Sequence, residues 1–407
     1  MRLRGKSPEV LSKKDPISPE CLAACLYFMC LPFTVVTTPF GSLLKVVTLP
    51  IMAFLVLRIL MGKSELTFHY VHFCYLIYII YTISMLFVFH DSKAVTTTKD
   101  MVLGTLMFLL ITARIYTNRE REWIESAWLI VGLICIYACL SSTEVVSKSE
   151  SRAVVRILGF EEDQNQFCAY LIMPTLISVK RFLERRRGYP VYLVIIALSF
   201  YSILKTGSRG GLLGILLGLF AYAAIGIKSV KTRLILFASA AALTLMIVTV
   251  VVPLLPENVA ARYTIQAVEE DGGSGRTEIW RFLIDYSFRE PGRLLRGSGI
   301  FSTYGIMKSA GFQNGVAHNA FIQILNDEGM IGLLLFIISI VSCLIRNMKR
   351  EPLYACAYLS MLGFAISLTF YVFKPNLNIM MMCAMSFYGS LPQDRLHDTT
   401  KGASLYA

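Results

Sequence analysis

The chain has 407 residues, of which 55% are hydrophobic and only 16% are charged, and its mean hydropathy is +0.60. This balance is more apolar than that of soluble domains and indicates a polytopic membrane protein. The formal net charge of +12 is no argument for nucleic-acid binding, because basic residues on the cytoplasmic side of a membrane protein produce the same excess.

Uncharged runs of about 17 or more residues recur along the chain, each long enough to cross a hydrocarbon core of roughly 30 Å. The first run lacks a small-residue cleavage site after it, so we expect a retained helix and not a signal peptide. The predicted spans are 20–38, 42–61, 68–89, 101–117, 125–142, 166–182, 189–206, 211–227, 233–252, 328–346, 353–373 and 376–391. The weakest runs begin near 101, 166 and 376, so eleven or thirteen spans remain open.

The distribution of Lys and Arg predicts the orientation of the chain. With the N-terminus inside, the inside connections account for the whole net charge of +12, and the outside connections are balanced. Twelve spans then place both termini in the cytoplasm, within a single integral membrane domain over 1–407. All ten cysteines fall in or at the ends of predicted spans, which favours apolar packing over disulfides or metal binding.

Two short polar stretches are predicted to face outward. Asp163-Gln-Asn165 precedes the span at 166, where Asp163 or Asn165 can cap the helix, and Asn165 can equally hold a polar substrate group. Lys205-Thr-Gly-Ser208-Arg209-Gly-Gly joins two spans in a tight turn. Its glycines and Arg209 serve either a simple turn with a snorkelling cation or the binding of a phosphate group.

A long polar segment, 253–320, interrupts the apolar pattern and is predicted to lie outside. Trp280, Leu283, Ile284 and Phe288 recur at helical spacing, which indicates an amphipathic helix on the membrane or on the helix bundle. Arg276 falls in the first turn of that helix, where the helix dipole disfavours a cation. The position of Arg276 therefore suggests that a ligand, and not the helix, requires the cation.

The pair His318-Asn319 lies at the seam between this polar segment and the next apolar helix. A histidine is more often structural than catalytic, but an imidazole here can serve as a general base near neutral pH. Downstream, the Glu328-Gly329 step predicts a break where an interfacial helix turns into the tenth span.

Other chemistries find little support in the sequence. Neither a Cys/His set with zinc spacing nor an outside cage of carboxylates is present, and the G-x-S-x-G nucleophile motif is absent. We therefore expect no metal, no cofactor and no serine-hydrolase mechanism.

Taken together, these stretches resemble the bacterial O-antigen ligase and O-antigen or exopolysaccharide polymerase superfamily over roughly 155–345. The matching text is Asp163-Gln-Asn165, Thr206-Gly-Ser208-Arg209-Gly, Gly275-Arg276-x-x-x-Trp280, Gly297-Ser-Gly299, His318-Asn319 and Glu328-Gly-Met-Ile-Gly332. The proline of the Asp-Pro-Asn motif common in the family is replaced here by Gln164, which weakens the role of that first stretch.

The resemblance implies an all-α, GT-C-type membrane glycosyltransferase that is metal-independent and inverting. Its donor would be an undecaprenyl-diphosphate-linked glycan, and its acceptor a saccharide hydroxyl, lipid-linked or otherwise, on the outer face of the cytoplasmic membrane. Carried over by motif, the catalytic residues are Arg209, Arg276 and His318. The predicted substrate-binding residues are Asp163, Asn165, Ser208, Trp280 and Asn319.

Two questions stay open at this point. The sequence does not separate a polymerase from a ligase, although the lack of an extra outside domain favours polymerisation of an exopolysaccharide or capsule. A transporter or flippase of lipid-linked oligosaccharide also has many spans, but it is expected to show ionisable residues in mid-membrane and symmetry between its halves. Neither feature is visible in the sequence.

Overall fold

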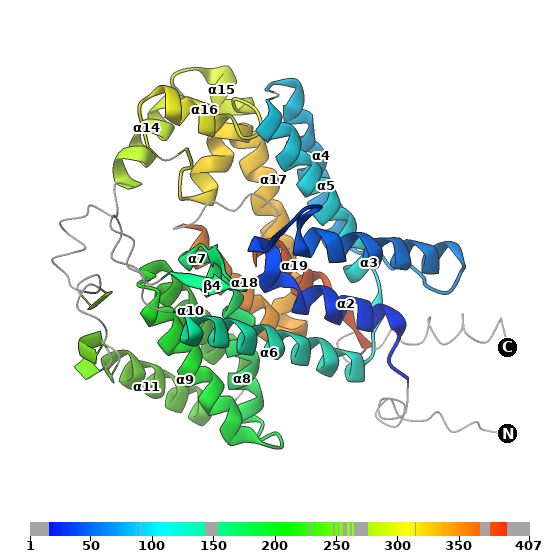
Figure 1. The fold of residues 1–407 in the computed structure, drawn as a ribbon, viewed down its shortest axis with the longest axis vertical. Coiled ribbons are helices and arrows are strands. Elements are labelled where there is room, and N and C mark those ends of the chain that lie inside the picture. Colours follow the sequence, from blue (N-terminus) through cyan, green and yellow to red (C-terminus); the bar gives the residue numbers. More distant parts are fainter. Residues whose placement is uncertain are drawn as a thin grey trace.

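The computed structural model describes residues 16–89, 91–142, 154–227, 229–246, 249–250, 252–254, 259–260, 263, 276–313, 315–366 and 375–388. Both chain ends lie outside the described residues, and so does part of the predicted 253–320 segment, including Gly275. The structure does not test predictions that concern them. The described residues form an almost entirely helical molecule (Figure 1).

The first third of the chain forms a group of apolar helices with three very short strands. Its elements are α2 (Pro19–Met29), η1 (Leu31–Val35), β1 (Thr37–Thr38), β2 (Gly41–Ser42), α3 (Leu43–Leu60), α4 (Tyr70–Ser84), η2 (Met85–Phe87), α5 (Ser92–Thr112), β3 (Ile115–Tyr116) and α6 (Asn118–Ser141). Strand β1 pairs antiparallel with β2, and β3 pairs parallel with β6 at the far end of the chain.

The start of α5 differs from the prediction by nine residues. The expected span was 101–117, but the helix begins at Ser92 because Asp91 caps it, its Oδ1 accepting a hydrogen bond from the Ala94 N–H at 2.6 Å. The first two turns are polar, so hydropathy alone does not reveal them, whereas the cap does.

The middle of the chain contains an unpredicted hairpin followed by helices. Its elements are β4 (Val155–Ile157), β5 (Phe160–Glu162), α7 (Gln164–Tyr170), α8 (Ile172–Leu183), α9 (Tyr189–Lys205), α10 (Arg209–Ala221), the π-helical turn η3 (Tyr222–Gly226), α11 (Val230–Met246) and η5 (Val252–Leu254). Helix α10 packs closely on α18, where the Ser360 hydroxyl donates to the Gly214 carbonyl at 2.6 Å. Small residues allow this close approach of two apolar helices.

The last third begins with three helices that were predicted to face outward, called the outward helices below, and then returns to apolar sequence. Its elements are α14 (Arg276–Phe288), α15 (Pro291–Arg296), α16 (Ser302–Ser309), α17 (Ala320–Arg350), α18 (Pro352–Ala365), α19 (Pro375–Ala384) and β6 (Ser386–Phe387). Helices α14, α15 and α16 gather at one end of the molecule beside α4 and the start of α17 (Figure 1).

Every predicted span overlaps at least one helix, but only some helices are long enough to cross a membrane. Among the described residues, six meet that criterion, and they are Leu43–Leu60, Tyr70–Phe87, Ser92–Thr112, Asn118–Ser141, Arg209–Gly226 and Ala320–Arg350. Shorter apolar helices occur at Pro19–Met29, Tyr189–Lys205 and Pro352–Ala365. The chain is therefore an all-helical polytopic membrane protein, and twelve spans remain a prediction.

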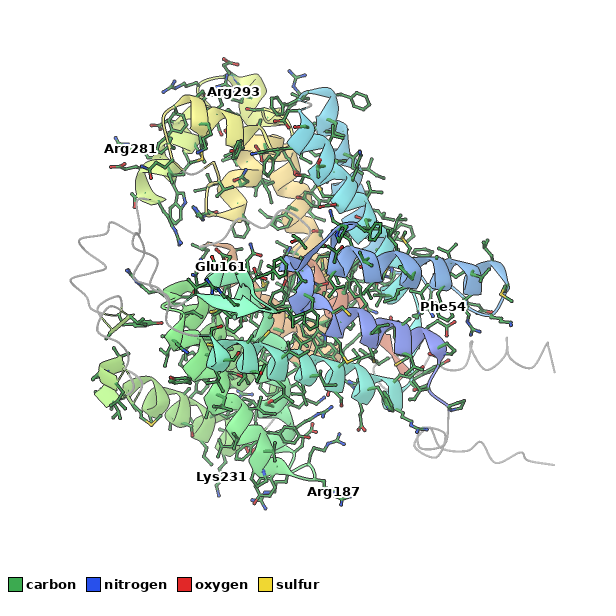
Figure 2. The ribbon with its side chains drawn as sticks, viewed as in Figure 1. Phe54, Glu161, Arg187, Lys231, Arg281 and Arg293 are labelled. Carbon is green, nitrogen blue, oxygen red and sulfur yellow. The ribbon has the colours of Figure 1, made fainter. Side chains whose placement is uncertain are left out.

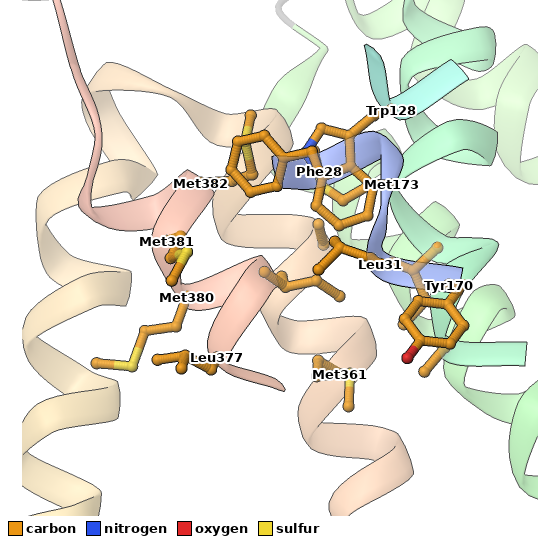
Figure 3. Packing of buried hydrophobic residues seen from close by; sticks show 14 of the residues in the cluster. Phe28, Leu31, Trp128, Tyr170, Met173, Met361, Leu377, Met380, Met381 and Met382 are labelled. Carbon is orange, nitrogen blue, oxygen red and sulfur yellow. The ribbon is translucent and has the colours of Figure 1, made fainter. Parts of the chain in front are cut away.

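The core lies where the N-terminal helices meet α6, α8 and the C-terminal helices (Figure 3). Phe28 on α2 packs on Trp128 of α6 with ring centroids 5.3 Å apart. Met380, Met381 and Met382 of α19 extend the same buried cluster. Flexible methionine side chains fill irregular gaps between helices, so this cluster joins elements that are far apart in the sequence.

Helix α17 contains the break that the sequence predicts. Gly329 has φ 69° and ψ −169° inside the helix, a conformation that favours glycine. The Ser298 N–H donates to the Asn326 carbonyl and the Gly299 N–H to the Asp327 carbonyl, each at 2.9 Å. The broken turn is thereby satisfied by the segment between α15 and α16, which locks the outward helices onto α17.

The side chains predicted to lie on opposite sides of the membrane are found at opposite ends of the molecule (Figure 2). Arg281 and Arg293, from the outside segment, lie at one end, and Arg187 and Lys231, from inside connections, lie at the other. Which side of the membrane each end faces stays a prediction.

Candidate functional site

The first predicted outward stretch is presented by the β4–β5 hairpin. Leu158 and Gly159 form its turn with φ values of 50° and 86°. The chain then enters α7, which is capped by Asp163, whose Oδ1 accepts hydrogen bonds from the Asn165 and Gln166 N–H groups at 3.0 and 2.9 Å. The capping interpretation of Asp163 is therefore confirmed. A direct role of Asp163 in substrate binding stays a prediction.

Asn165 and Ser208 are joined although they come from different helices. The Ser208 hydroxyl donates to Asn165 Oδ1 at 2.6 Å and accepts from the Gly211 N–H at 3.0 Å, which makes Ser208 the cap of α10. Both side chains are buried. The bond ties the start of α7 to the start of α10 and holds the backbone of Arg209, the first residue of α10, in place.

The glycines of this turn serve the backbone more than a ligand. Gly207 takes the left-handed conformation with φ 66°, as a tight turn requires. The Gly211 N–H, which the sequence suggested for anion binding, already donates to Ser208. A Cβ at Gly211 would lie 2.8 Å from the Cys168 side chain, so this glycine permits α10 to pack on α7.

The second predicted outward stretch forms α14, as the amphipathic pattern indicates. Arg276 is its first residue, and Ile279 and Leu283 are buried on its inner face. Ile284 and Phe288, which were predicted to share that face, are 38% and 59% exposed. Ile284 and Phe288 therefore lie outside the buried stripe, whereas Trp280 and Phe282 pack against the buried cluster around Leu283.

Trp280 connects α14 to the segment that carries His318. Its indole Nε1–H donates to the Ala317 carbonyl at 2.8 Å. His318 follows with φ 51°, a left-handed conformation that is uncommon for residues other than glycine. Asn319 then caps α17, its Oδ1 accepting from the Phe321 and Ile322 N–H groups at 3.0 and 3.1 Å.

The predicted site residues thus form two groups. The hairpin cluster comprises Asp163, Asn165, Ser208 and Arg209, and the loop cluster comprises Arg276, Trp280, His318 and Asn319. Figure 1 places the loop cluster's α14 at one end of the molecule and the hairpin cluster's α7 and α10 nearer its middle. In the hairpin cluster, hydrogen bonds join Asp163 to Asn165 and Asn165 to Ser208. In the loop cluster, Trp280 bonds to the Ala317 carbonyl beside His318. Whether the two clusters form one site stays a prediction.

The residues predicted to act on the substrate are more exposed than the residues that hold their backbone. Arg209, Arg276 and His318 are all partly exposed. Asn165, Ser208 and Asn319, in contrast, are 7%, 2% and 7% exposed and use their side-chain oxygens to hold backbone or one another. The exposed cations and imidazole can therefore reach a ligand while buried neighbours fix their main chain.

A buried polar network at the start of α17, close in the chain to the loop cluster, was not predicted from the sequence. Asp327 is fully buried, and its Oδ1 accepts from the Ser302 hydroxyl, the Thr303 N–H and the Thr303 hydroxyl at 3.0, 2.8 and 2.6 Å. Its Oδ2 accepts from Gln323 Nε2 at 2.9 Å. The available signal was a run of polar residues at the head of an apolar helix, since buried ionisable groups there need partners.

A family comparison bears on residues that lie in both clusters. Residues 193–337 match the family model described as O-Antigen ligase. The resemblance predicted from the motifs is confirmed. The O-antigen ligase region, 193–337, contains Arg209, Arg276 and His318, and it leaves Asp163 and Asn165 outside. A comparison with curated proteins found no match.

The match and the apolar helices support a general description of the protein. Its apolar helices indicate a membrane protein, and residues 193–337 are similar to the O-antigen ligase family. That similarity supports, in general terms, glycosyl transfer from a lipid-linked glycan to a saccharide acceptor. Within the described residues, no group of three or more His, Cys, Asp or Glu side chains could hold a metal ion.

Proposed function

We propose that this protein transfers a glycan from an undecaprenyl-diphosphate-linked donor to a saccharide hydroxyl on the outer face of the cytoplasmic membrane. The observation that carries the proposal is the O-antigen ligase region with Arg209, Arg276 and His318 in it, all three partly exposed. The hairpin cluster and the loop cluster would form two walls of one site between α10 and α14.

The proposed reaction is a single displacement without a metal. The acceptor oxygen forms a bond to the anomeric carbon while the bond from that carbon to the diphosphate oxygen breaks with inversion. His318 takes the proton of the attacking hydroxyl, and undecaprenyl diphosphate leaves with the electron pair. Arg209 and Arg276 stabilise the charge that develops on the diphosphate through forked hydrogen bonds.

The direct test of this proposal is Arg276→Ala. Loss of one pre-organised donor to a developing oxyanion typically lowers the rate by roughly 10²–10³. We expect a fold loss of that size in release of undecaprenyl diphosphate by the purified protein. The donor is the lipid-linked glycan that accumulates in a host strain from which the gene has been deleted. Arg276→Lys is expected to be nearly as poor, because a point charge replaces a bidentate fork.

The matched control is Arg281→Ala on the same helix, where an exposed arginine is removed five positions further along. It should transfer at the unchanged rate. An Arg276→Ala protein that is as active as the Arg281→Ala control would refute the proposal.

The acceptor distinguishes the two possible forms of the reaction. We propose the polymerase form, in which one lipid-linked repeat unit is both donor and acceptor. Incubation with that unit alone should then give a ladder of lengths on a gel. A single transferred product that forms only after a second acceptor is added would identify a ligase instead.

The same proposal includes twelve spans, a GT-C-type architecture and both termini in the cytoplasm. It is supported by helices at each predicted span and by the opposite placement of Arg281 and Arg187 (Figure 2).

A further inference from the structure

Ala317, the residue just before His318, is held through both its backbone N–H and its backbone carbonyl. Ala317 is fully buried, its N–H donates to Gln323 Oε1 at 2.9 Å, and its carbonyl accepts from Trp280 Nε1 at 2.8 Å. On the other side of His318, Asn319 caps α17. The main chain therefore enters and leaves His318 through restrained residues, and this restraint maintains its left-handed conformation.

The orientation of the Gln323 side chain follows from its two partners. A backbone N–H can only donate and a carboxylate accepts, so both bonds form only with Oε1 toward Ala317 and Nε2 toward Asp327. Gln323 is 1% exposed, so water cannot replace either partner. The amide acts as a fixed link between the buried carboxylate of Asp327 and the backbone N–H of Ala317, the residue before His318.

Asp327 is itself immobilised. Its carboxylate accepts from Ser302 and Thr303 of α16 as well as from Gln323, and it is fully buried. Because α16 and the start of α17 share this carboxylate, a displacement of Asp327 would be opposed by several charge-assisted hydrogen bonds. The chain of contacts runs from α16 through Asp327, Gln323 and Ala317 to His318.

We propose that Gln323, fixed by Asp327, is a positioning residue that holds His318 in place to accept the proton of the attacking hydroxyl. This inference rests on the proposed function. A left-handed conformation is strained for a histidine. Without the two hydrogen bonds that hold Ala317, from Trp280 and to Gln323 (the clamp), the backbone of His318 relaxes. A displacement of about 1 Å can lower a rate by about 10²-fold.

The hydrogen bond from Gln323 to Asp327 can be rebuilt with the donor and the acceptor exchanged. Gln323→Glu still accepts from Ala317 but sets a second carboxylate against Asp327. In Asp327→Asn, the new amide nitrogen faces Nε2 of Gln323, and two donors cannot bond. If the Gln323 amide turns over, its bond to the new amide at position 327 forms but its bond from the Ala317 N–H is lost. In the double variant Q323E/D327N, the donor lies on position 327 and the acceptors on 323, so every bond of the link can form again.

We expect each single variant to lower kcat by about 10- to 100-fold, with the KM for the donor changed by less than about twofold. The double variant should recover most of the lost kcat. The assay uses the purified full-length protein and the lipid-linked glycan extracted from the gene-deleted host. Rates are expressed per folded protein, measured by size-exclusion chromatography and thermal unfolding in detergent.

Two further variants keep the test decisive. Gln313→Glu is the matched control, because it adds a carboxylate at an exposed position of the same outward segment. Trp280→Phe removes the other half of the clamp without touching the buried carboxylate and should also lower kcat more than it raises KM. This variant tests whether the clamp positions His318 if the variants at positions 323 or 327 fail to fold.

The outcomes separate this inference from the proposed function. Normal transfer by His318→Ala refutes the proposed function itself. The positioning role alone is refuted if His318→Ala loses transfer while Gln323→Glu keeps a normal kcat. If Gln323→Glu does not fold, a normal kcat in Trp280→Phe has the same meaning. A double variant that stays as slow as the singles while folded also refutes the positioning role. Added to His318→Ala, Gln323→Glu should cause no further loss, and an additional tenfold loss would contradict the clamp.

Discussion

At the residue scale, the side chains that can act on a ligand differ from those that hold them. Arg209 is partly exposed and begins α10, while its neighbour Ser208 is buried and linked to Asn165. The Ser208 hydroxyl donates one hydrogen bond and accepts another, and it thereby fixes the backbone of the adjacent Arg209. We therefore expect substitutions of the buried neighbour to act on the cation's position.

Ser208→Ala tests this dependence. It removes the cap of α10 and the bond to Asn165, and loss of a helix cap costs about 1 kcal/mol. The melting temperature in detergent should fall, and transfer per folded protein should fall with it. Ser309→Ala is the control, because that hydroxyl is exposed and bonds only within its own helix, to the Ile306 carbonyl. Unchanged stability and rate in Ser208→Ala would show that the link is dispensable.

At the element scale, most helices were predictable from the sequence because uncharged runs and caps report them directly. The β4–β5 hairpin was not, since Val155–Ile157 and Phe160–Glu162 are too short to show an alternating pattern. The start of α5 was also missed, because its first two turns are polar. Local signals define elements only where a pattern is long enough to repeat.

The break in α17 is the element on which the outward helices depend. A Cβ at Gly329 would lie 2.5 Å from the Gly297 nitrogen and the Leu295 carbonyl oxygen, and φ 69° disfavours a side chain there. Gly329→Ala should therefore lower the melting temperature and displace α15 from α17, with loss of transfer. Backbone atoms cannot move aside as a flexible side chain would.

The control for that change is Gly305→Ala on α16, where an added Cβ meets no atom within 4 Å. This variant should melt at or above the wild-type temperature, because alanine favours a helix over glycine by roughly 1 kcal/mol. If both glycine variants behave alike, the docking of α15 at the break does not support the fold.

At the scale of the whole molecule, candidate site residues could be named from the sequence, whereas the contacts that hold them could not. The motifs singled out Arg209, Arg276 and His318, but no local pattern could reveal that Ser208 meets Asn165, 43 positions away. The same holds for the clamp, in which Trp280 reaches the Ala317 carbonyl 37 positions on. Tertiary contacts between helices arise from packing, which a single sequence does not display.

The orientation of the molecule is testable with single cysteines. The ten native cysteines are all buried or half-buried. Arg281→Cys and Arg187→Cys place new thiols at opposite ends of the molecule (Figure 2). In intact cells, a membrane-impermeant maleimide should label the first and not the second, whereas both should react after lysis. Labelling of position 187 in intact cells would invert the proposed orientation.

The break at Gly329 also has a consequence for the order in which the chain is synthesised. The segment around Gly297 and Gly299 bonds to the carbonyls of Asn326 and Asp327, and the Tyr81 hydroxyl on α4 donates to the Glu328 carbonyl at 3.0 Å. The ribosome makes α4 long before this segment and α17 only after it. The outward helices therefore emerge before half of their docking surface exists, and the loop cluster can assemble only once α17 has entered the membrane.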